Sequence, residues 1–332
     1  STDMSKTCEL TKAAKSGGSL VLAQLSHAGR QTPKAINPDP LSISNLKLDL
    51  EGYGQPRMAS DKDFSELIEK FSTSAKLAQE CGFDGVEIHA AHGYLLSSSL
   101  SPRINNRKDK WGGSFENRAR LLQLILQKVR ESVGNNFILA VKINSSDFQK
   151  GGLEISDSVK IANLIEKENI DFIEVSGGNF EAPEAYQYVS LKESTKSREA
   201  YFLDAAKNIK ASVSIPIMVT GGFRSISVME DALTSSSTDL IGIGRPFVID
   251  PSFPYKLLNG DISVLPAVER NFPPAQDIPK GAVLNWFCDQ LALQGKTGKG
   301  DINIPLIDGH ERYIKQSDEA THSLISFRND SK

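Results

Sequence analysis

The chain has 332 residues, of which 39% are hydrophobic and 24% are charged, and its formal net charge at pH 7 is −3. These values are ordinary for a globular enzyme. The small negative charge gives no reason to expect a nucleic acid or an anionic membrane as a partner. No apolar run approaches the roughly 18 residues that a membrane helix needs.

Short apolar strands alternate with longer amphipathic helices along the chain. The predicted strands are Leu20–Leu25, Gly85–His89, Phe137–Ile143, Phe172–Ser176, Ile215–Thr220 and Leu240–Gly244. The predicted helices are Met4–Lys15, Asp61–Cys81, Ser114–Val133, Ile155–Lys167, Glu199–Lys210 and Ser225–Leu233. Near-continuous apolar strands are typical of a parallel sheet that is covered on both faces.

Six βα units predict an α/β protein, and the two candidate architectures are a TIM barrel and an open doubly wound sheet. No GxGxxG follows an early strand, whereas glycine pairs recur after the late strands, which favours the barrel. We expect residues 1–264 to form a (β/α)8-type barrel and residues 265–332 to form an appendage. Its stretch Gly281–Leu293 is amphipathic, and the end, Gln316–Lys332, is polar and expected to be mobile.

The segment from Gly85 to Arg118 is the most informative part of the sequence. An apolar strand delivers His89, His92 and Tyr94 within six positions. Imidazole and phenol groups need hydrogen-bond partners when buried, and they suit acid–base work. A structural histidine at a strand end is the alternative. Two histidines three positions apart could also form half of a metal site, but no third ligand and no CxxC accompany them, so we predict no metal.

Glycines after the last two strands indicate a phosphate site. Gly221-Gly222 follows one strand, and GIGR, ending in Gly244 and Arg245, follows the next. Glycine lets backbone N–H groups approach an anion, and arginine adds a charge-assisted hydrogen bond. Barrels often bind phosphate at these loops. The alternative is that the glycines only form tight turns.

Two polar residues interrupt apolar strands. Lys142 lies within FILAVKI, and because a buried lysine without a partner is costly, its charge should reach the barrel mouth or a ligand. Snorkelling from the strand end is the alternative. Gln24 occupies a similar position at the end of LVLAQL.

The three cysteines, Cys8, Cys81 and Cys288, are scattered without a pairing pattern. This favours a reducing compartment, and we expect a cytoplasmic protein. No signal peptide is visible, and the chain does not begin with methionine.

These motifs together resemble the old yellow enzyme family of FMN-dependent ene-reductases and NADH:flavin oxidoreductases, in particular its bacterial-type branch and eukaryotic relatives. The resemblance runs from about Leu20 to Pro251. It is carried, in order, by AQLSHAGRQ (Ala23–Gln31), GVEIHAAHGYLLSSSLSP (Gly85–Pro102), NNRKDKWGGSFENR (Asn105–Arg118), VTGGFRS (Val219–Ser225) and DLIGIGRPFVIDP (Asp239–Pro251).

The resemblance implies a chemistry for the histidine segment. FMN would take hydride from NADH or NADPH and pass it from N5 to the β-carbon of an enone or enal. His89 and His92 would hydrogen-bond the substrate carbonyl oxygen, which is oxyanion-type stabilisation, and Tyr94 would protonate the α-carbon. No dinucleotide fingerprint distinguishes NADH from NADPH.

The resemblance also implies the residues that hold FMN. Gln24 would contact the pyrimidine ring of the flavin. Lys142 would lie near N1 and O2, where the family usually has arginine. Gly222, Gly244 and Arg245 would hold the phosphate, with Gly221 beside them.

The chain departs from the family at its start. About two βα units precede the strand that matches LVLAQL in the family, but only 19 residues precede Leu20 here. We therefore expect strands three to eight of the barrel without strands one and two. A fragment or a splice or gene-model variant is the favoured explanation, and a partner or the tail that covers the gap is the alternative. Such an open sheet would expose two edges, and we expect it to bind FMN poorly or not at all.

Two other functions remain open at this point. A non-catalytic remnant could serve as a binding or regulatory subunit. A flavin-free barrel lyase or aldolase could use Lys142 as a Schiff base, with its substrate in the phosphate site. The expected partner in the leading interpretation is a small α,β-unsaturated carbonyl compound, and the pattern does not decide between a monomer and a homo-oligomer.

Overall fold

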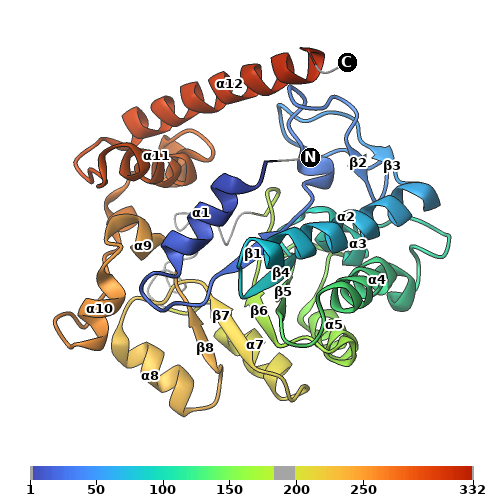
Figure 1. Cartoon of the computed structure of the whole chain (residues 1–332), viewed down its shortest axis with the longest axis horizontal. Coiled ribbons are helices and arrows are strands. Elements are labelled where there is room, and N and C mark those ends of the chain that lie inside the picture. Colours follow the sequence, from blue (N-terminus) through green and yellow to red (C-terminus); the bar gives the residue numbers. More distant parts are fainter. Residues whose placement is uncertain (1–2, 183–198, 331–332) are drawn as a thin grey trace. The chain divides into compact units, whose positions relative to one another are not determined.

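The computed structural model describes residues 3–182 and 199–330 (Figure 1). Six strands form one sheet in the order β1-β4-β5-β6-β7-β8, and two short strands, β2 and β3, pair separately. The strands are β1 (Leu22–Leu25), β2 (Leu41–Ser42), β3 (Arg57–Met58), β4 (Gly85–Ala90), β5 (Ile138–Asn144), β6 (Phe172–Ser176), β7 (Ile217–Thr220) and β8 (Leu240–Gly242). The six strands and their order along the chain confirm the predicted α/β class and the predicted strands.

Helices connect the strands. They are α1 (Ser5–Ala14), α2 (Asp61–Glu80), α3 (Leu95–Leu100), α4 (Phe115–Val133), α5 (Ile155–Ile165), α7 (Leu203–Lys210), α8 (Ile226–Thr234), α9 (Arg245–Ile249), α10 (Phe253–Leu258), α11 (Ala282–Thr297) and α12 (Leu306–Asp330). The pairings of β4 with β1 and of β5 with β4 and β6 are all parallel.

The described residues form two compact units. Unit 1 comprises residues 3–182, 204–218 and 238–240. Unit 2 comprises residues 199–203, 219–237 and 241–330 of the described chain. Unit 1 contains β1, β4, β5 and β6 with α2, α4 and α5, and unit 2 contains α8 to α12.

Capping residues and a glycine fix the ends of the helices in unit 1. Ser60 caps α2 by a capping box with Asp63, and Ser114 accepts a hydrogen bond from the backbone N–H of Asn117 to begin α4. Gly134, at φ 75°, ends α4. The buried face of α2 follows a helical spacing: Phe64, Leu67, Phe71, Ala75 and Ala78. This face packs on β1 and β4, whose own apolar residues complete the core.

Three aspartates fix the alignment of neighbouring strands in unit 1. Each aspartate lies just before a strand and donates its backbone N–H to the carbonyl of a residue at the start of the neighbouring strand. Its carboxylate accepts the N–H of that same residue and pairs with a cation that follows a helix or lies in its last turn. The three sets are Asp84 with Val21 and Lys15, Asp171 with Leu139 and Arg130, and Asp239 with Ile217 and Lys210. The carboxylate accepts the strand N–H at 2.7–2.8 Å in each set. We call these three sets the aspartate clamps.

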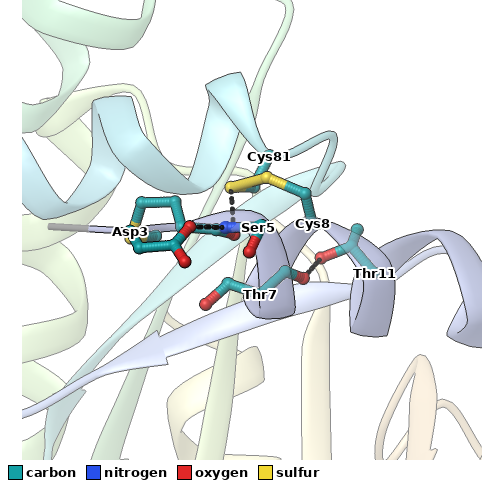
Figure 2. The surroundings of a disulfide bond; sticks show 7 residues. Asp3, Ser5, Thr7, Cys8, Thr11 and Cys81 are labelled. Atoms are coloured by element: carbon teal, nitrogen blue, oxygen red, sulfur yellow. Dashed lines mark hydrogen bonds between the residues drawn. A yellow bond between two sulfur atoms is a disulfide. The ribbon is translucent and has the colours of Figure 1, made fainter.

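Helix α1 is joined to the end of α2 by a disulfide between Cys8 and Cys81 (Figure 2). The two Cα atoms are 4.4 Å apart, and 73 positions separate the residues in sequence. The interpretation of the cysteines as unpaired thiols is therefore wrong for this pair, because spacing alone gave no sign of it. Disulfides persist in oxidising compartments, so the cysteines no longer favour a reducing one.

The C-terminal region differs from its prediction. The segment expected to be polar and mobile is mostly helical, since α12 continues to Asp330; its last two residues lie outside the described residues. The beginning of α12 packs on α11. Trp286 of α11 lies against Gly309 of α12, and the side chains of Asn285 of α11 and His310 of α12 form a hydrogen bond. Contacts with α11 therefore order a helix whose own composition is polar.

Smaller differences from the prediction concern the helices. The helix predicted from Glu199 begins only at Leu203, and α3, α9 and α10 were not predicted. Within the described ranges, no helix combines the length and the apolar character that crossing a bilayer requires.

Candidate active site

The carboxyl end of β4 leads into the histidine segment of unit 1. His89 lies within β4 and is buried, whereas His92 follows the strand in a left-handed conformation, at φ 63°. This conformation is rare for a residue with a side chain and must be held by its surroundings. The backbone N–H of His92 donates to Asn144 Oδ1 at 3.0 Å, and its carbonyl accepts from Gln31 Nε2 at 3.1 Å.

The three predicted catalytic residues lie together. The ring centroids of His89 and His92 are 5.1 Å apart, and those of His89 and Tyr94 are 5.0 Å apart. Phe180 packs on the other side of Tyr94, with ring centroids 5.9 Å apart. The structure therefore brings two imidazoles and one phenol into a single cluster.

Burial sets the protonation of this cluster. Burial, followed by the charge of nearby Lys142, lowers the pKa of His89 to about 4. Burial, followed by the charges of His89 and Lys142, also lowers the pKa of His92 well below its ordinary value. Both imidazoles are therefore neutral near pH 7. Burial raises the pKa of Tyr94, so the phenol keeps its proton.

The neutral imidazoles can act as hydrogen-bond donors. His92 Nε2 lies 2.9 Å from Ser176 Oγ. His89 Nδ1 is buried and has no hydrogen-bond partner within the described structure. A buried polar atom without a partner is costly, so a ligand oxygen that met this nitrogen would stabilise the site.

Gln24 and Lys142, the other predicted residues of unit 1, each contact a buried glutamate. Gln24 Nε2 donates to Glu87 Oε1 at 2.5 Å, and Lys142 Nζ lies 2.7 Å from Glu174 Oε1. Neither glutamate was predicted from the sequence as a residue of the site. The signal that could have found them is the single acid within each of the apolar strands GVEIH and FIEVS.

The predicted phosphate residues lie in unit 2. Gly221 and Gly222 have φ values of 147° and 87°, which favour glycine, and a Cβ on Gly222 would lie 2.6 Å from the Tyr201 ring. A Cβ on Gly242 would overlap the Thr220 hydroxyl. The Thr220 Oγ1 atom is buried and has no hydrogen-bond partner among the described residues. These glycines are therefore required by their surroundings, and they adjoin an unsatisfied hydroxyl.

Two arginine side chains and two backbone N–H groups of unit 2 contact carboxylates. Arg245 Nη1 lies 3.4 Å from the buried Glu269, and Arg224 Nη2 lies 2.5 Å from the same Oε1 atom. The backbone N–H groups of Arg224 and Ser225 donate to Glu199 at 2.8 and 2.7 Å. Carboxylates thus occupy donors that suit a phosphate.

Gly244 differs from the other predicted glycines. Its φ is −112°, and a Cβ there would meet open space, so its backbone does not require glycine. In the part of the chain that the structure describes, no three His, Cys, Asp or Glu side chains are grouped to hold a metal ion.

The chain matches the model of the NADH:flavin oxidoreductase / NADH oxidase family over residues 2–261. It is 38% identical to an NADH-dependent flavin oxidoreductase of Aspergillus parasiticus over 271 residues, which cover 79% of this chain and 60% of that protein. It is 32% identical to NADPH dehydrogenase of Bacillus subtilis, covering 80% of this chain and 75% of that protein. It is also 32% identical to NADH oxidase of Thermoanaerobacter brockii, covering 76% and 38%.

Two solved structures are similar. A 2-naphthoyl-CoA reductase in complex with 2-naphthoyl-CoA superposes with a TM-score of 0.71 and 28% identity, covering 78% of this chain and 41% of that one. Histamine dehydrogenase from Rhizobium sp. 4-9, at 23% identity and a TM-score of 0.70, covers 88% and 40% and supports the fold alone.

The chain spans 60% of the Aspergillus relative and less than half of the Thermoanaerobacter one. The family match nevertheless covers most of the chain, and it includes the strands and the histidine segment described above. The chain belongs to the NADH:flavin oxidoreductase / NADH oxidase family.

Proposed function

We propose that this chain carries the substrate-activating part of an FMN-dependent NAD(P)H oxidoreductase that reduces activated C=C bonds of enones and enals. The observation that carries the proposal is the pair of neutral imidazoles, buried His89 and half-buried His92, beside a protonated phenol, with His89 Nδ1 lacking a partner among the described residues. A conjugated carbonyl compound suits such a cluster, because its oxygen accepts hydrogen bonds while its α-carbon accepts a proton.

His89 and His92 activate the substrate carbonyl in this proposal. Hydride addition to the β-carbon places negative charge on the carbonyl oxygen. Neutral N–H donors that are already oriented in a buried site stabilise that developing charge without reorganising. Asn144 and Gln31 hold His92 in place from its backbone, so orientation is set before the substrate arrives.

Tyr94 supplies the proton to the α-carbon. Burial keeps the phenol protonated, and its ring is held between His89 and Phe180. General acids positioned in this way contribute about 10²- to 10⁴-fold to a rate.

Each unit, taken by itself, offers groups that fit a part of FMN. In unit 1, His89 Nδ1 has no partner among the described residues, and Gln24 and Lys142 would hold the ring system. In unit 2, Thr220 Oγ1 also lacks a partner among the described residues and Gly222 is tightly packed, and Gly221, Gly222, Gly244 and Arg245 would hold the phosphate. When bound, FMN supplies the hydride that NADH or NADPH provides.

The names of the relatives are consistent with this substrate class. The 2-naphthoyl-CoA reductase acts on a thioester whose carbonyl is conjugated with an aromatic ring, as its ligand indicates. The named relatives use NADH or NADPH, and this chain could be supplied by either. We propose small α,β-unsaturated carbonyl compounds as partners. The cytoplasmic location stays a prediction that the Cys8–Cys81 disulfide does not support, and subcellular fractionation would test it.

The Schiff-base lyase is less well supported than the reductase. Lys142 Nζ is held 2.7 Å from Glu174 Oε1 in an ion pair, whereas a Schiff base requires this nitrogen to attack a carbonyl carbon. Borohydride trapping with a carbonyl substrate would modify Lys142 only if the lyase interpretation were correct.

The test combines flavin retention with alkene reduction. The purified chain is mixed with FMN, desalted and examined by visible absorption, then reduced anaerobically by NADH or NADPH and challenged with 2-cyclohexenone. Retained flavin that the nicotinamide bleaches and the enone reoxidises is the result that supports the proposal, and it would overturn the expectation from the sequence that FMN binds poorly.

Two variants separate binding from chemistry. His89→Asn/His92→Asn should keep the flavin and lose reoxidation by the enone, whereas His322→Asn, on the exposed surface of α12, should behave like the parent. A folded chain that retains no flavin would overturn the reductase proposal for this chain and favour a non-catalytic binding subunit.

A further inference from the structure

A row of polar side chains lies beside the imidazoles on one face of the sheet. Gln24 on β1 is in register with Glu87 on β4, and Lys142 on β5 is in register with both His89 on β4 and Glu174 on β6. Residues in register on neighbouring strands share a face, and so do Glu87 and His89, which are two positions apart. The row therefore adjoins the candidate active site directly.

Each glutamate of this row has one partner on the same face of the sheet. Gln24 donates to Glu87 at 2.5 Å, and Lys142 pairs with Glu174 at 2.7 Å. Glu87 and Glu174 lie on the same face as Lys142, because Lys142 is in register with Glu174 and with His89, two positions after Glu87. Two carboxyl groups therefore share this face with one lysine.

The charges around the pair favour one bound proton. Glu87 and Glu174 are only 6% and 5% exposed, and among the ion pairs of the described residues it is Lys142 that contacts this pair, through Glu174. His89 and His92, the titratable groups above them, are neutral near pH 7 because burial lowers the pKa of each. Two ionised glutamates would leave one uncompensated negative charge in a buried site, whereas one proton makes the row neutral.

We propose that Glu87 and Glu174 share one proton at neutral pH and act as a positioning pair that keeps the row beside His89 electrically neutral. With the proton bound, the pair consists of one carboxylic acid and one carboxylate. When the proton is lost, the pair becomes two carboxylates, and a net negative charge lies beside the imidazoles. Burial and the neighbouring Glu174 raise the pKa of Glu87 to about 8, against the opposing effects of Lys142 and Gln24, which agrees with this assignment.

The consequence for catalysis rests on the proposed function. Negative charge that develops on a substrate oxygen at His89 would be opposed by a second negative charge in the row. The shared proton therefore favours the reaction at neutral pH and makes the site less able to stabilise an anion when the pH rises.

The test uses the flavin-free chain, so its outcome is independent of whether FMN binds. Infrared difference spectra are recorded as the pH is raised from neutral through about 8, the pKa of Glu87. We expect a protonated-carboxyl C=O band at neutral pH that disappears over this range. The band should shift when the chain is labelled with ¹³C-glutamate, and a band that does not shift would overturn the assignment.

Three variants locate the proton. Glu87→Gln and Glu174→Gln should both lack the band, because in the second variant Lys142 becomes free to stabilise an ionised Glu87. Lys142→Met should move the loss of the band to higher pH, since the cation favours ionisation. Glu116→Gln, on the exposed surface of α4, is the matched control and should keep the parent band.

The infrared band of the wild-type chain tests the shared proton even if a variant fails to fold. Absence of the band at neutral pH in the wild-type chain would overturn the shared proton. So would a band that persists in both glutamine variants, or a Lys142→Met titration that moves to lower pH or does not move.

Discussion

Asn144 Oδ1 accepts a hydrogen bond from the backbone N–H of His92 at 3.0 Å, and this bond ties the end of β5 to the left-handed turn after β4. The same amide donates from Nδ2 to Asp147 at 3.0 Å and to the Gly178 carbonyl at 3.2 Å. Asn144 is 2% exposed, so no water replaces these bonds easily. It is a positioning residue for the imidazole of His92.

Asn144→Ala should therefore reduce enone reduction by about 10²-fold through misplacement of His92. It should also lower the free energy of unfolding by about 1–3 kcal/mol, because the His92 N–H loses its partner. Steady-state kinetics and urea unfolding would measure the two effects. Asn208→Ala, on the exposed face of α7, is the control. Unchanged kinetics in a folded Asn144→Ala chain would contradict the positioning role.

Tyr94→Phe removes the phenolic proton and keeps the ring that packs between His89 and Phe180. We expect reoxidation of the reduced flavin by an enone to slow by about 10²- to 10⁴-fold, with flavin reduction by NADH unchanged. Stopped-flow measurements of the two half-reactions distinguish these steps. Tyr255→Phe, at a side chain that is 70% exposed, should leave both unchanged. Equal slowing of both half-reactions would point to a damaged site instead of a lost proton donor.

The buried His89 should make stability depend on pH. Its pKa is lowered from 6.5 to about 4, so the folded chain binds fewer protons than the unfolded chain between these values. The contribution is fully present above the unfolded pKa of 6.5 and is lost as the pH falls through about 4. It amounts to something on the order of 3 kcal/mol.

The measurement is the difference in unfolding free energy between the wild-type chain and His89→Gln across this range. Taking the difference removes the opposite contribution of Glu87. Its raised pKa stabilises the chain as the pH falls from about 8 towards 4.5, the ordinary pKa of a glutamate. His322→Gln should give a flat difference. A flat difference for His89→Gln would mean that its imidazole is not buried in the neutral form.

The disulfide between Cys8 and Cys81 should contribute to stability. Closing a loop of 73 positions restricts the unfolded chain, and we expect Cys8→Ser to lower the free energy of unfolding by about 2–4 kcal/mol. Calorimetry with and without a reductant would measure this. Cys288→Ser keeps the disulfide and should respond to the reductant like the parent, whereas Cys8→Ser should not respond. A response in Cys8→Ser would assign the effect to another group.

The strands and the histidine cluster were predictable because each is local in sequence. FILAVKI and GVEIH are apolar runs of strand length, and His89, His92 and Tyr94 lie within six positions of one another. The family resemblance was likewise carried by contiguous motifs, and the family match confirms it. What lies close along the chain could therefore be predicted from the residues themselves.

The residues that were missed depend on contacts between distant segments. Glu87 and Glu174 belong to different strands, and their significance appears only when β5 places Lys142 between them. Cys8 and Cys81 meet only because α1 lies against the end of α2. Helix α12 is ordered by Trp286 and Asn285 of α11, which its own polar sequence does not reveal.

The aspartate clamps have a consequence for how this family can vary. Asp84, Asp171 and Asp239 fix strand alignment at the amino ends of the strands, whereas His89 and the residues after it lie at the carboxyl end of β4. A slip of one residue would turn every side chain of a strand to the opposite face. Because that slip is prevented at one end, the loops at the other end are free to change in length and composition. New substrate preferences can therefore arise in those loops without disturbing the frame that supports them.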